Sequence, residues 1–326
     1  MNKKYVLFAG ATVLSLSIVA MSFSAKTNEN KVSDSAGLST VSEKSSNKSE
    51  IGTNASQSDT EKDKNITEIP IKHLDVDTKT NLYSKVLNSI DYYNVINGTI
   101  ETNMLNQTDE VIEYNVDMSK GTAYQHVLGR DFDEEVFAQD NNVYTIDNLT
   151  KTYSVEAAVA KSDEYEEDDV LLGELDVKDR IKYTTADEEE TDDAEISESG
   201  NELIPVYYYR QNPTNVHYAS TVSLFPQEMA FGFLSDENLW DITDKTEFLN
   251  RKCTVVEGKT EQGYGEKLNI SSFVIIIDDE SGVILDFKGY DQQGNITNYT
   301  STKNVSFSSK SIKKLDLSNY SDYAVE

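Results

Sequence analysis

The chain has 326 residues, enough for one large domain or two small ones, and its 58 acidic against 29 basic residues give a formal net charge of −29. Phosphate backbones and anionic membrane surfaces would repel such a chain, which argues against nucleic-acid binding. Disordered acidic chains are poor in aromatic residues, so the 19 Tyr and 11 Phe indicate that this chain can form a hydrophobic core.

Cysteine and histidine are too scarce to build a metal centre. The one cysteine, Cys253, has no second cysteine with which to form an internal disulfide. The three histidines, His73, His126 and His217, are scattered along the chain, so a Cys/His zinc cluster is excluded. We therefore expect neither a bound metal nor a cofactor.

Residues 1–24 have the layout of a secretory signal peptide, because two lysines precede an apolar run and small residues follow it. Cleavage after Ser24 would place Ser22 and Ser24 at the −3 and −1 positions. The alternative is an uncleaved membrane anchor, although the run is slightly shorter than the ~20 apolar residues needed to span a bilayer. We expect a secreted or extracytoplasmic protein, which an uncleaved segment would tether.

Residues 25–66 are rich in Ser, Lys and Asn and contain no aromatic residue. Such a stretch buries too little apolar area to offset the entropy of ordering it. We expect a disordered linker that leads into a folded domain over residues 67–326.

The folded domain is predicted to open with a helix over residues 77–89. Leu82, Val86 and Ile90 recur on one face of that helix. Asp77 or Thr78 can serve as its N-cap.

Strand patterns follow this helix. Residues 111–119 alternate between apolar and polar side chains, which predicts a strand with one buried face. Residues 122–129 are predicted as another strand. Residues 134–156 predict two strands about an Asp-Asn-Asn turn, with a third possible.

An acidic tract over about residues 161–200 holds 17 Asp or Glu against four Lys or Arg. A calcium site is one interpretation, but calcium loops of the D-x-[DN]-x-[DN]-G type need a spacing and a glycine that neither acidic run has. We expect a solvated insertion in the folded domain, whose role the sequence leaves open.

The next segment is predicted as a hairpin followed by a helix. Residues 202–225 favour the hairpin, with its loop at 211–215. Pro226 then begins a helix that continues to Trp240, in which Met229 lies four residues before Phe233.

Four strand-like runs close the chain, at residues 251–258, 272–278, 283–291 and 296–308. Two turns of similar composition, Asp279–Gly282 and Asp291–Gly294, separate the last three. Aspartate first and glycine fourth is typical of a type I turn, in which the glycine takes a positive φ. We therefore expect a three-stranded antiparallel meander; the alternative is a cation site at the acidic turns.

The order of these elements resembles the LolA-like superfamily of bacterial outer-membrane lipoprotein carriers. That group includes RseB-like periplasmic sensors and exported proteins of Gram-positive bacteria. The resemblance is carried by a proline-started helix, an Arg-x-Cys strand ending in Gly, and two apolar strands with glycine turns. The residues concerned are Pro226, Arg251, Cys253, Gly258, Asp278, Gly282 and Gly294.

The resemblance implies an α+β fold: a strongly curved antiparallel sheet, or half-open barrel, with helices across its concave face and an apolar cavity between them. It implies a non-enzymatic binding protein that holds a lipid or lipoprotein acyl chain, or an apolar segment. The alternative is an envelope-stress sensor that acts on a membrane-bound partner such as an anti-sigma factor. The candidate ligand-lining residues are Met229, Phe231, Phe233 and Trp240, although aromatic stripes of this kind also form ordinary cores.

Enzyme signatures are missing from the sequence. It contains no G-x-S-x-G elbow, no H-E-x-x-H helix and no phosphate-binding glycine loop. His126 and His217 lie in strand-like runs and are expected to be half-exposed sheet residues, and Cys253 is expected to be a packed thiol. We expect no enzyme; an unrecognised cell-wall hydrolase is the remaining enzymatic alternative.

Overall fold

The computed structural model describes residues 71–104, 108–161, 181–185, 203–207 and 209–325. The expected signal peptide, the expected linker and most of the acidic tract lie outside these residues. The described residues belong to one compact unit. None of its helices combines the length and the apolar character that crossing a bilayer requires.

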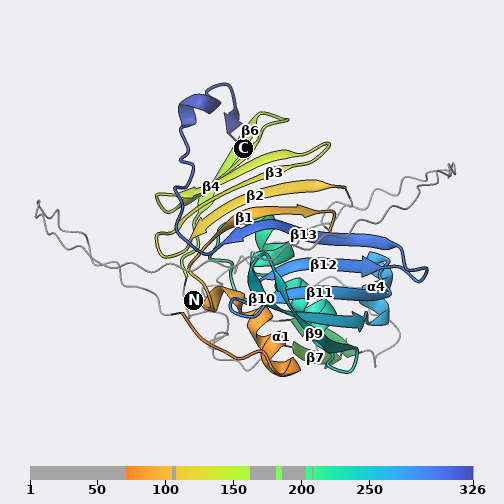
Figure 1. The fold of residues 1–326 in the computed structure, drawn as a ribbon. Coiled ribbons are helices and arrows are strands. Elements are labelled where there is room, and N and C mark those ends of the chain that lie inside the picture. The colour runs from red at the N-terminus through yellow and green to blue at the C-terminus, as the bar shows by residue number, and fades with distance from the viewer. Residues whose placement is uncertain (1–70, 105–107, 162–180, 186–202, 208, 326) are drawn as a thin grey trace, which may run out of the picture. The chain divides into compact units, whose positions relative to one another are not determined.

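The main sheet has 12 strands in the order β14-β6-β5-β4-β3-β2-β1-β13-β12-β11-β10-β9 (Figure 1). Neighbours pair antiparallel except β14 and β6, which pair parallel. Because β9 and β14 are its two edges, the sheet is open. Its strands are β1 (Val95–Thr102), β2 (Glu110–Asp117), β3 (Thr122–Leu128), β4 (Asp133–Gln139), β5 (Asn142–Asp147), β6 (Thr152–Ala157), β9 (Trp240–Phe248), β10 (Arg251–Lys259), β11 (Ser272–Asp278), β12 (Ile284–Tyr290), β13 (Ile296–Ser306) and β14 (Ala324–Val325).

The remaining elements are short. β7 (Ile181–Thr185) and β8 (Leu203–Tyr207) form a separate antiparallel pair. The helical elements are α1 (Lys79–Leu87), η1 (Ser89–Asp91), α2 (His217–Ala219), η4 (Ser220–Leu224), α3 (Gln227–Met229), η5 (Ala230–Leu234), α4 (Gln262–Leu268) and η6 (Leu317–Tyr320). The predicted α+β class, a curved antiparallel sheet with helices against one face, is confirmed.

The helices and the sheet enclose two groups of buried side chains. The first lies between α1, η5 and strands β10–β12, and includes Leu82, Phe233 and Phe273. The second lies between η1, α2, η4 and strands β1–β4, and includes Ile112 and Val222. We call the helix-covered face of the sheet its inner face.

The first helix and the alternating strand are confirmed. α1 begins after Thr78, whose side chain accepts a hydrogen bond from the Asn81 backbone N–H, and it buries Leu82 and Val86. In β2, Ile112 and Tyr114 are buried on the inner face, as the alternation predicts.

The predicted hairpin at residues 202–225 is wrong in its second half. Residues 217–224 are helical, as α2 and η4. Val216, Ala219, Val222 and Leu224 are the buried apolar residues there. The first three recur every three residues, a spacing that suits a helix better than a strand. Val216, Val222 and Leu224 also lie an even number of residues apart, which is why the sequence favoured a strand.

The second predicted helix is shorter than expected. Helical structure after Pro226 ends at Leu234, and Trp240 is the first residue of β9 rather than a helical residue. The indole N–H of Trp240 donates to the Leu234 carbonyl over 3.0 Å, which ties the strand start to the helix end. β9, α4 and β14 were not predicted.

The meander at the end of the chain is confirmed. β11 pairs with β12 and β12 with β13, all antiparallel. Both turn glycines have positive φ, +74° at Gly282 and +83° at Gly294. Their surroundings differ, because a Cβ on Gly282 would lie 2.7 Å from the Lys85 backbone oxygen, whereas a Cβ on Gly294 would meet no atom within 4 Å.

This difference makes the two turns a matched pair for mutagenesis. Gly294→Ala should cost about 1–2 kcal/mol of unfolding free energy, from the left-handed backbone alone. Gly282→Ala should cost about 1–3 kcal/mol more, because the added methyl group overpacks against α1. Urea denaturation of both variants measures the difference. Equal losses would show that the Gly282 turn does not pack on α1.

Candidate functional site

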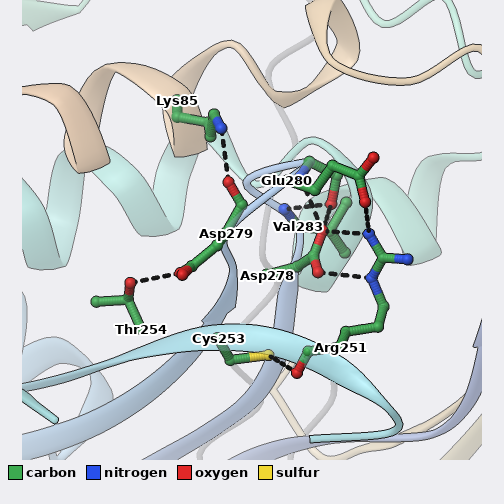
Figure 2. Close-up of polar contacts among 9 residues, drawn as sticks. Lys85, Arg251, Cys253, Thr254, Asp278, Asp279, Glu280 and Val283 are labelled. Carbon is green, nitrogen blue, oxygen red and sulfur yellow. Dashed lines mark hydrogen bonds and ion pairs between the residues drawn. The ribbon is translucent and has the colours of Figure 1, made fainter. Parts of the chain in front are cut away.

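The acidic turn after β11 is a hydrogen-bonded network (Figure 2). The Asp278 carboxylate is 1% exposed. It accepts from Arg251 Nε over 2.6 Å and from Arg251 Nη2 over 3.0 Å. It also accepts from the backbone N–H of Ser281 over 2.8 Å and from its hydroxyl over 2.5 Å. Four donors therefore satisfy this buried charge.

The next residue, Asp279, links the turn to two other elements. Thr254 Oγ1 of β10 donates to its carboxylate over 2.5 Å, and Lys85 Nζ of α1 donates to its backbone carbonyl over 2.6 Å. Burial lowers the pKa of Lys85, although the carboxylates of Asp278 and Asp279 act to raise it. The described residues contain no group of His, Cys, Asp or Glu arranged to hold a metal ion. The hydrogen bonds of Asp278 and Asp279 connect the turn to β10 and α1.

This network fixes Arg251 at the start of β10. Besides Asp278, its guanidinium donates to Glu280 over 2.8 Å. The same guanidinium lies over the ring of Phe307, 4.1 Å from its centroid, which is a cation–π contact. Arg251 is thus held between a carboxylate pair and an aromatic ring.

Arg251 and Phe307 form part of a cleft of about 330 Å³, which we call the aromatic cleft. Tyr93 packs edge-on against Phe307, with ring centroids 6.0 Å apart, and its hydroxyl donates to the Leu224 carbonyl over 2.9 Å. The rings are therefore already ordered. The residues that line the cleft are Ile71, Lys72, His73, Tyr92, Tyr93, Asn94, Val95, Arg251, Glu280, Ser281 and Phe307.

A second buried carboxylate, that of Asp91, holds Lys72, which also lines the cleft. Asp91 accepts from both terminal nitrogens of Arg210, each over 3.0 Å, and from Lys72 Nζ over 3.0 Å. Burial alone would raise the pKa of Asp91, but the hydrogen bonds and charge of Arg210 outweigh it and lower that pKa. The Lys72 backbone N–H also donates to the Asp91 carbonyl over 2.9 Å. The segment at residues 71–73 is thus fixed beside the cleft.

A hollow of different character lies between α4 and the turn after β12. It measures about 560 Å³ and most of its lining is polar. It is lined by Lys259, Thr260, Gly265, Glu266, Asn269, Ile270, Ser271, Asp291, Gln292 and Gln293.

The four candidate ligand-lining residues lie together in the first core group, between η5 and the sheet. Met229, Phe231 and Phe233 are each 3% exposed, and Trp240 is 1% exposed. The Phe233 ring lies 5.0 Å from that of Phe273 and 4.9 Å from that of Phe287, between centroids. In this structure the four side chains fill the space between helix and sheet, and they line neither the aromatic cleft nor the polar hollow.

The remaining candidates take structural positions. Cys253 is fully buried, and burial raises its thiol pKa to about 12. His126 lies in β3 and contacts Asp133 over 3.0 Å. His217 begins α2 and does not lie in a strand. Burial and the neighbouring Asp147 raise the pKa of Glu134 to about 7, and Glu134 lines neither hollow.

Sequence reasoning singled out Arg251 but missed the aromatic residues that line the cleft with it. Tyr92 and Tyr93 lie between η1 and β1, and Phe307 comes directly after β13. The only local signal is that aromatic residues stand at strand ends. Their meeting depends on the antiparallel pairing of β1 with β13, which joins distant parts of the chain.

No protein-family model and no curated protein matches the chain. Similar solved structures include the MucA/MucB complex of Pseudomonas aeruginosa, with 11% identity, 70% of this chain and 56% of that chain covered, and a TM-score of 0.33. LprF of Mycobacterium bovis is 8% identical, with 74% of this chain and 99% of that chain covered and a TM-score of 0.35. A LolA superfamily protein of Nitrosomonas europaea is 4% identical, with 73% of this chain and 97% of that chain covered and a TM-score of 0.20. The chain thus spans little more than half of the MucA/MucB chain that it matches.

The Arg251–Asp278 pair should contribute strongly to stability. Arg251→Ala should lower the free energy of unfolding by about 3 kcal/mol, because it leaves a buried carboxylate without its cation. Arg251→Lys should cost less, since it keeps the charge but loses the two parallel hydrogen bonds. Lys303→Ala is the control: its pair with Glu101 is exposed, so the loss should stay below about 1 kcal/mol. Chemical denaturation measures all three; similar losses for Arg251→Ala and Lys303→Ala would contradict the assignment.

Proposed function

We propose that the chain is an exported, non-enzymatic binding protein that holds an apolar or amphipathic ligand, such as a lipid acyl chain or an apolar peptide segment, in the aromatic cleft. The observation that carries the proposal is the cleft itself, with about 330 Å³ of space between ordered aromatic rings and fixed cations. Ligand pockets typically have volumes of about 300–1,000 Å³ and apolar walls with a few polar groups.

The apolar part of the ligand would contact the rings of Tyr92, Tyr93 and Phe307. Each methylene group removed from water contributes about 0.8 kcal/mol. Because the Tyr93 hydroxyl is bonded to Leu224 and Phe307 is stacked under Arg251, few side chains need to be ordered on binding. Preordered walls reduce the entropic cost of binding.

The polar end of an amphipathic ligand would lie at the rim. Lys72 and Arg251 both line the cleft, and the Lys72 side chain is 56% exposed. An acidic or hydrogen-bond-accepting group on the ligand can therefore contact Lys72 without breaking the buried Asp91–Arg210 pair. This favours ligands that combine an apolar chain with a polar or anionic end.

The location expected from the sequence, between η5 and the sheet, needs a rearrangement. Met229, Phe231, Phe233 and Trp240 fill that space, so a ligand reaching them requires η5 to separate from β10–β12. The aromatic cleft needs no such movement. We therefore favour the cleft as the binding site, with the deeper location as the alternative that mutagenesis distinguishes.

A fluorescent fatty-acid probe titrated into the purified protein tests the proposal. Saturable binding is expected at micromolar probe, with displacement by unlabelled fatty acid or lysolipid. Phe307→Ala should weaken binding by about tenfold, the loss of roughly 1.4 kcal/mol of apolar contact. Phe233→Leu, a conservative change in the packed core, should leave the affinity unchanged.

Two other outcomes have definite meanings. If Phe233→Leu weakens binding and Phe307→Ala does not, the ligand lies between η5 and the sheet and the cleft assignment is wrong. If the unmodified protein shows no saturable binding at micromolar probe, the binding function itself is wrong.

Export is tested by the mass of the mature protein. Expression in a bacterial host with a general secretion system should yield an extracytoplasmic chain that begins at Ala25, because Ser22 and Ser24 are small residues at −3 and −1. Ser24→Phe should block cleavage and retain residues 1–24. Intact mass spectrometry reads both results, and an unprocessed chain in the cytoplasm of the host would contradict export.

A further inference from the structure

The C-terminal segment crosses the outer face of the sheet, opposite the helices. After β13 the chain runs over the sheet as residues 308–325, which we call the strap, and ends as β14 beside β6 (Figure 1). Side chains alternate between faces along a strand, so Ala138 points to the inner core while Glu135 and Phe137 point outward. The strap contacts this outward set.

One strap residue, Lys313, occupies a site built by two neighbouring strands. Its ammonium group lies 4.9 Å from the ring centroid of Tyr124 in β3 and 5.4 Å from that of Phe137 in β4. It also pairs with the carboxylate of Glu135. We call Tyr124, Glu135 and Phe137 the cation cage.

The carboxylate of the cage is held in its charged form. Tyr124 donates to Glu135 Oε1 over 2.8 Å, and Tyr320 of the strap donates to Oε2 over 2.7 Å. Burial alone would raise the pKa of Glu135, but the hydrogen bonds from Lys313, Tyr320 and Tyr124 outweigh it and lower that pKa. Two ring faces around a fixed negative charge form an arrangement that recognises an ammonium group.

The cage belongs to the sheet, whereas its occupant belongs to a mostly exposed segment that polar contacts hold against the sheet, including those of Ser311, Leu315 and Tyr323. Tyr124 and Phe137 are register partners across β3 and β4, with ring centroids 5.1 Å apart. Most strap residues are exposed, and only Ala324 and Val325 join the sheet. A segment with few buried contacts opens more readily than the core beneath it.

We propose that the cation cage is a recognition site for a lysine side chain presented by an extended segment of a partner protein, and that the strap occupies it as an internal competitor. The net charge of −29 favours approach of a basic segment over an acidic one. The cage walls lie on the outer face, so this site is distinct from the aromatic cleft and does not depend on the proposed ligand there.

Binding of a fluorescent peptide to full-length variants tests the proposal. The peptide carries residues 308–326 and thus supplies a lysine-bearing segment in trans. Lys313→Ala should bind it at least tenfold more tightly than the unmodified chain, whose own strap competes at high effective concentration. Lys314→Ala, a change at the adjacent exposed lysine, should behave like the unmodified chain.

Two further measurements identify the cage as the site. In the double variant Lys313→Ala/Glu135→Gln, the gain in peptide affinity should be lost. A peptide with alanine in place of Lys313 should likewise bind the Lys313→Ala variant no more tightly than the unmodified chain. Equal affinities for Lys313→Ala and Lys314→Ala, or a gain that survives Glu135→Gln, would overturn the proposal.

A small cation provides a test that does not require the double variant to fold. n-Butylammonium should raise the melting temperature of Lys313→Ala in a concentration-dependent manner, because it refills the vacated cage. It should not raise that of Lys314→Ala, and n-butanol should raise neither. Equal shifts for the two variants would show that the cage has no preference for an ammonium group.

Discussion

The buried carboxylate of Asp278 and the neighbouring Asp279 hold three parts of the protein together. Its four hydrogen bonds join the start of β10, through Arg251, to the turn between β11 and β12, through Ser281. The neighbouring Asp279 carbonyl extends the connection to α1 through Lys85. A charge removed from water is tolerated only when it is fully partnered, so these contacts restrict each other's positions. The aromatic cleft has its fixed Arg251 because of this restriction.

The same physical pattern recurs at two other places. Asp91 is buried and is matched by Arg210 and Lys72 beside the cleft, and Glu135 is buried and is matched by Lys313 on the outer face. In a chain with twice as many acidic as basic residues, at least half of the carboxylates have no basic residue of their own to pair with. These three buried carboxylates use cations from distant segments, whereas the buried Asp117 and Asp286 pair with the nearby Lys120 and Lys288. The Glu135 pair ties the strap to the sheet, and the Asp91 pairs tie the segments around Lys72 and Arg210 to η1.

The sequence predicted those elements whose signal is local. The alternation in β2, the N-cap at Thr78 and the glycine turns of the meander each depend on neighbouring residues, and the structure confirms them. Val216–Leu224 was misassigned because Val216, Val222 and Leu224 lie an even number of residues apart, as in a strand, while Val216, Ala219 and Val222 have a helical spacing. Trp240 was misassigned because an aromatic residue after a helical pattern gives no indication of where the helix stops.

The cleft and the cage could not be predicted for a different reason. Phe307 reaches Tyr93, and Lys313 reaches Glu135, only after the sheet has formed. No local pattern encodes which aromatic side chains meet across the ends of β1 and β13, or which lysine lies over β4. Such sites depend on strand order, and the antiparallel sheet sets that order through pairings between remote residues.

The pairing of β1 with β13 has a consequence for when the protein can fold. Thr102 pairs with Thr300, and Asn97 with Ser306, so the centre of the sheet joins the beginning of the described chain to a segment close to its end. Long-range pairings of this kind form slowly, because most of the polypeptide must be present before the two strands meet. During synthesis the pairing of β1 with β13 therefore cannot form until nearly all of the chain has left the ribosome. The centre of the sheet is therefore closed only after strands β2–β12 have been synthesised.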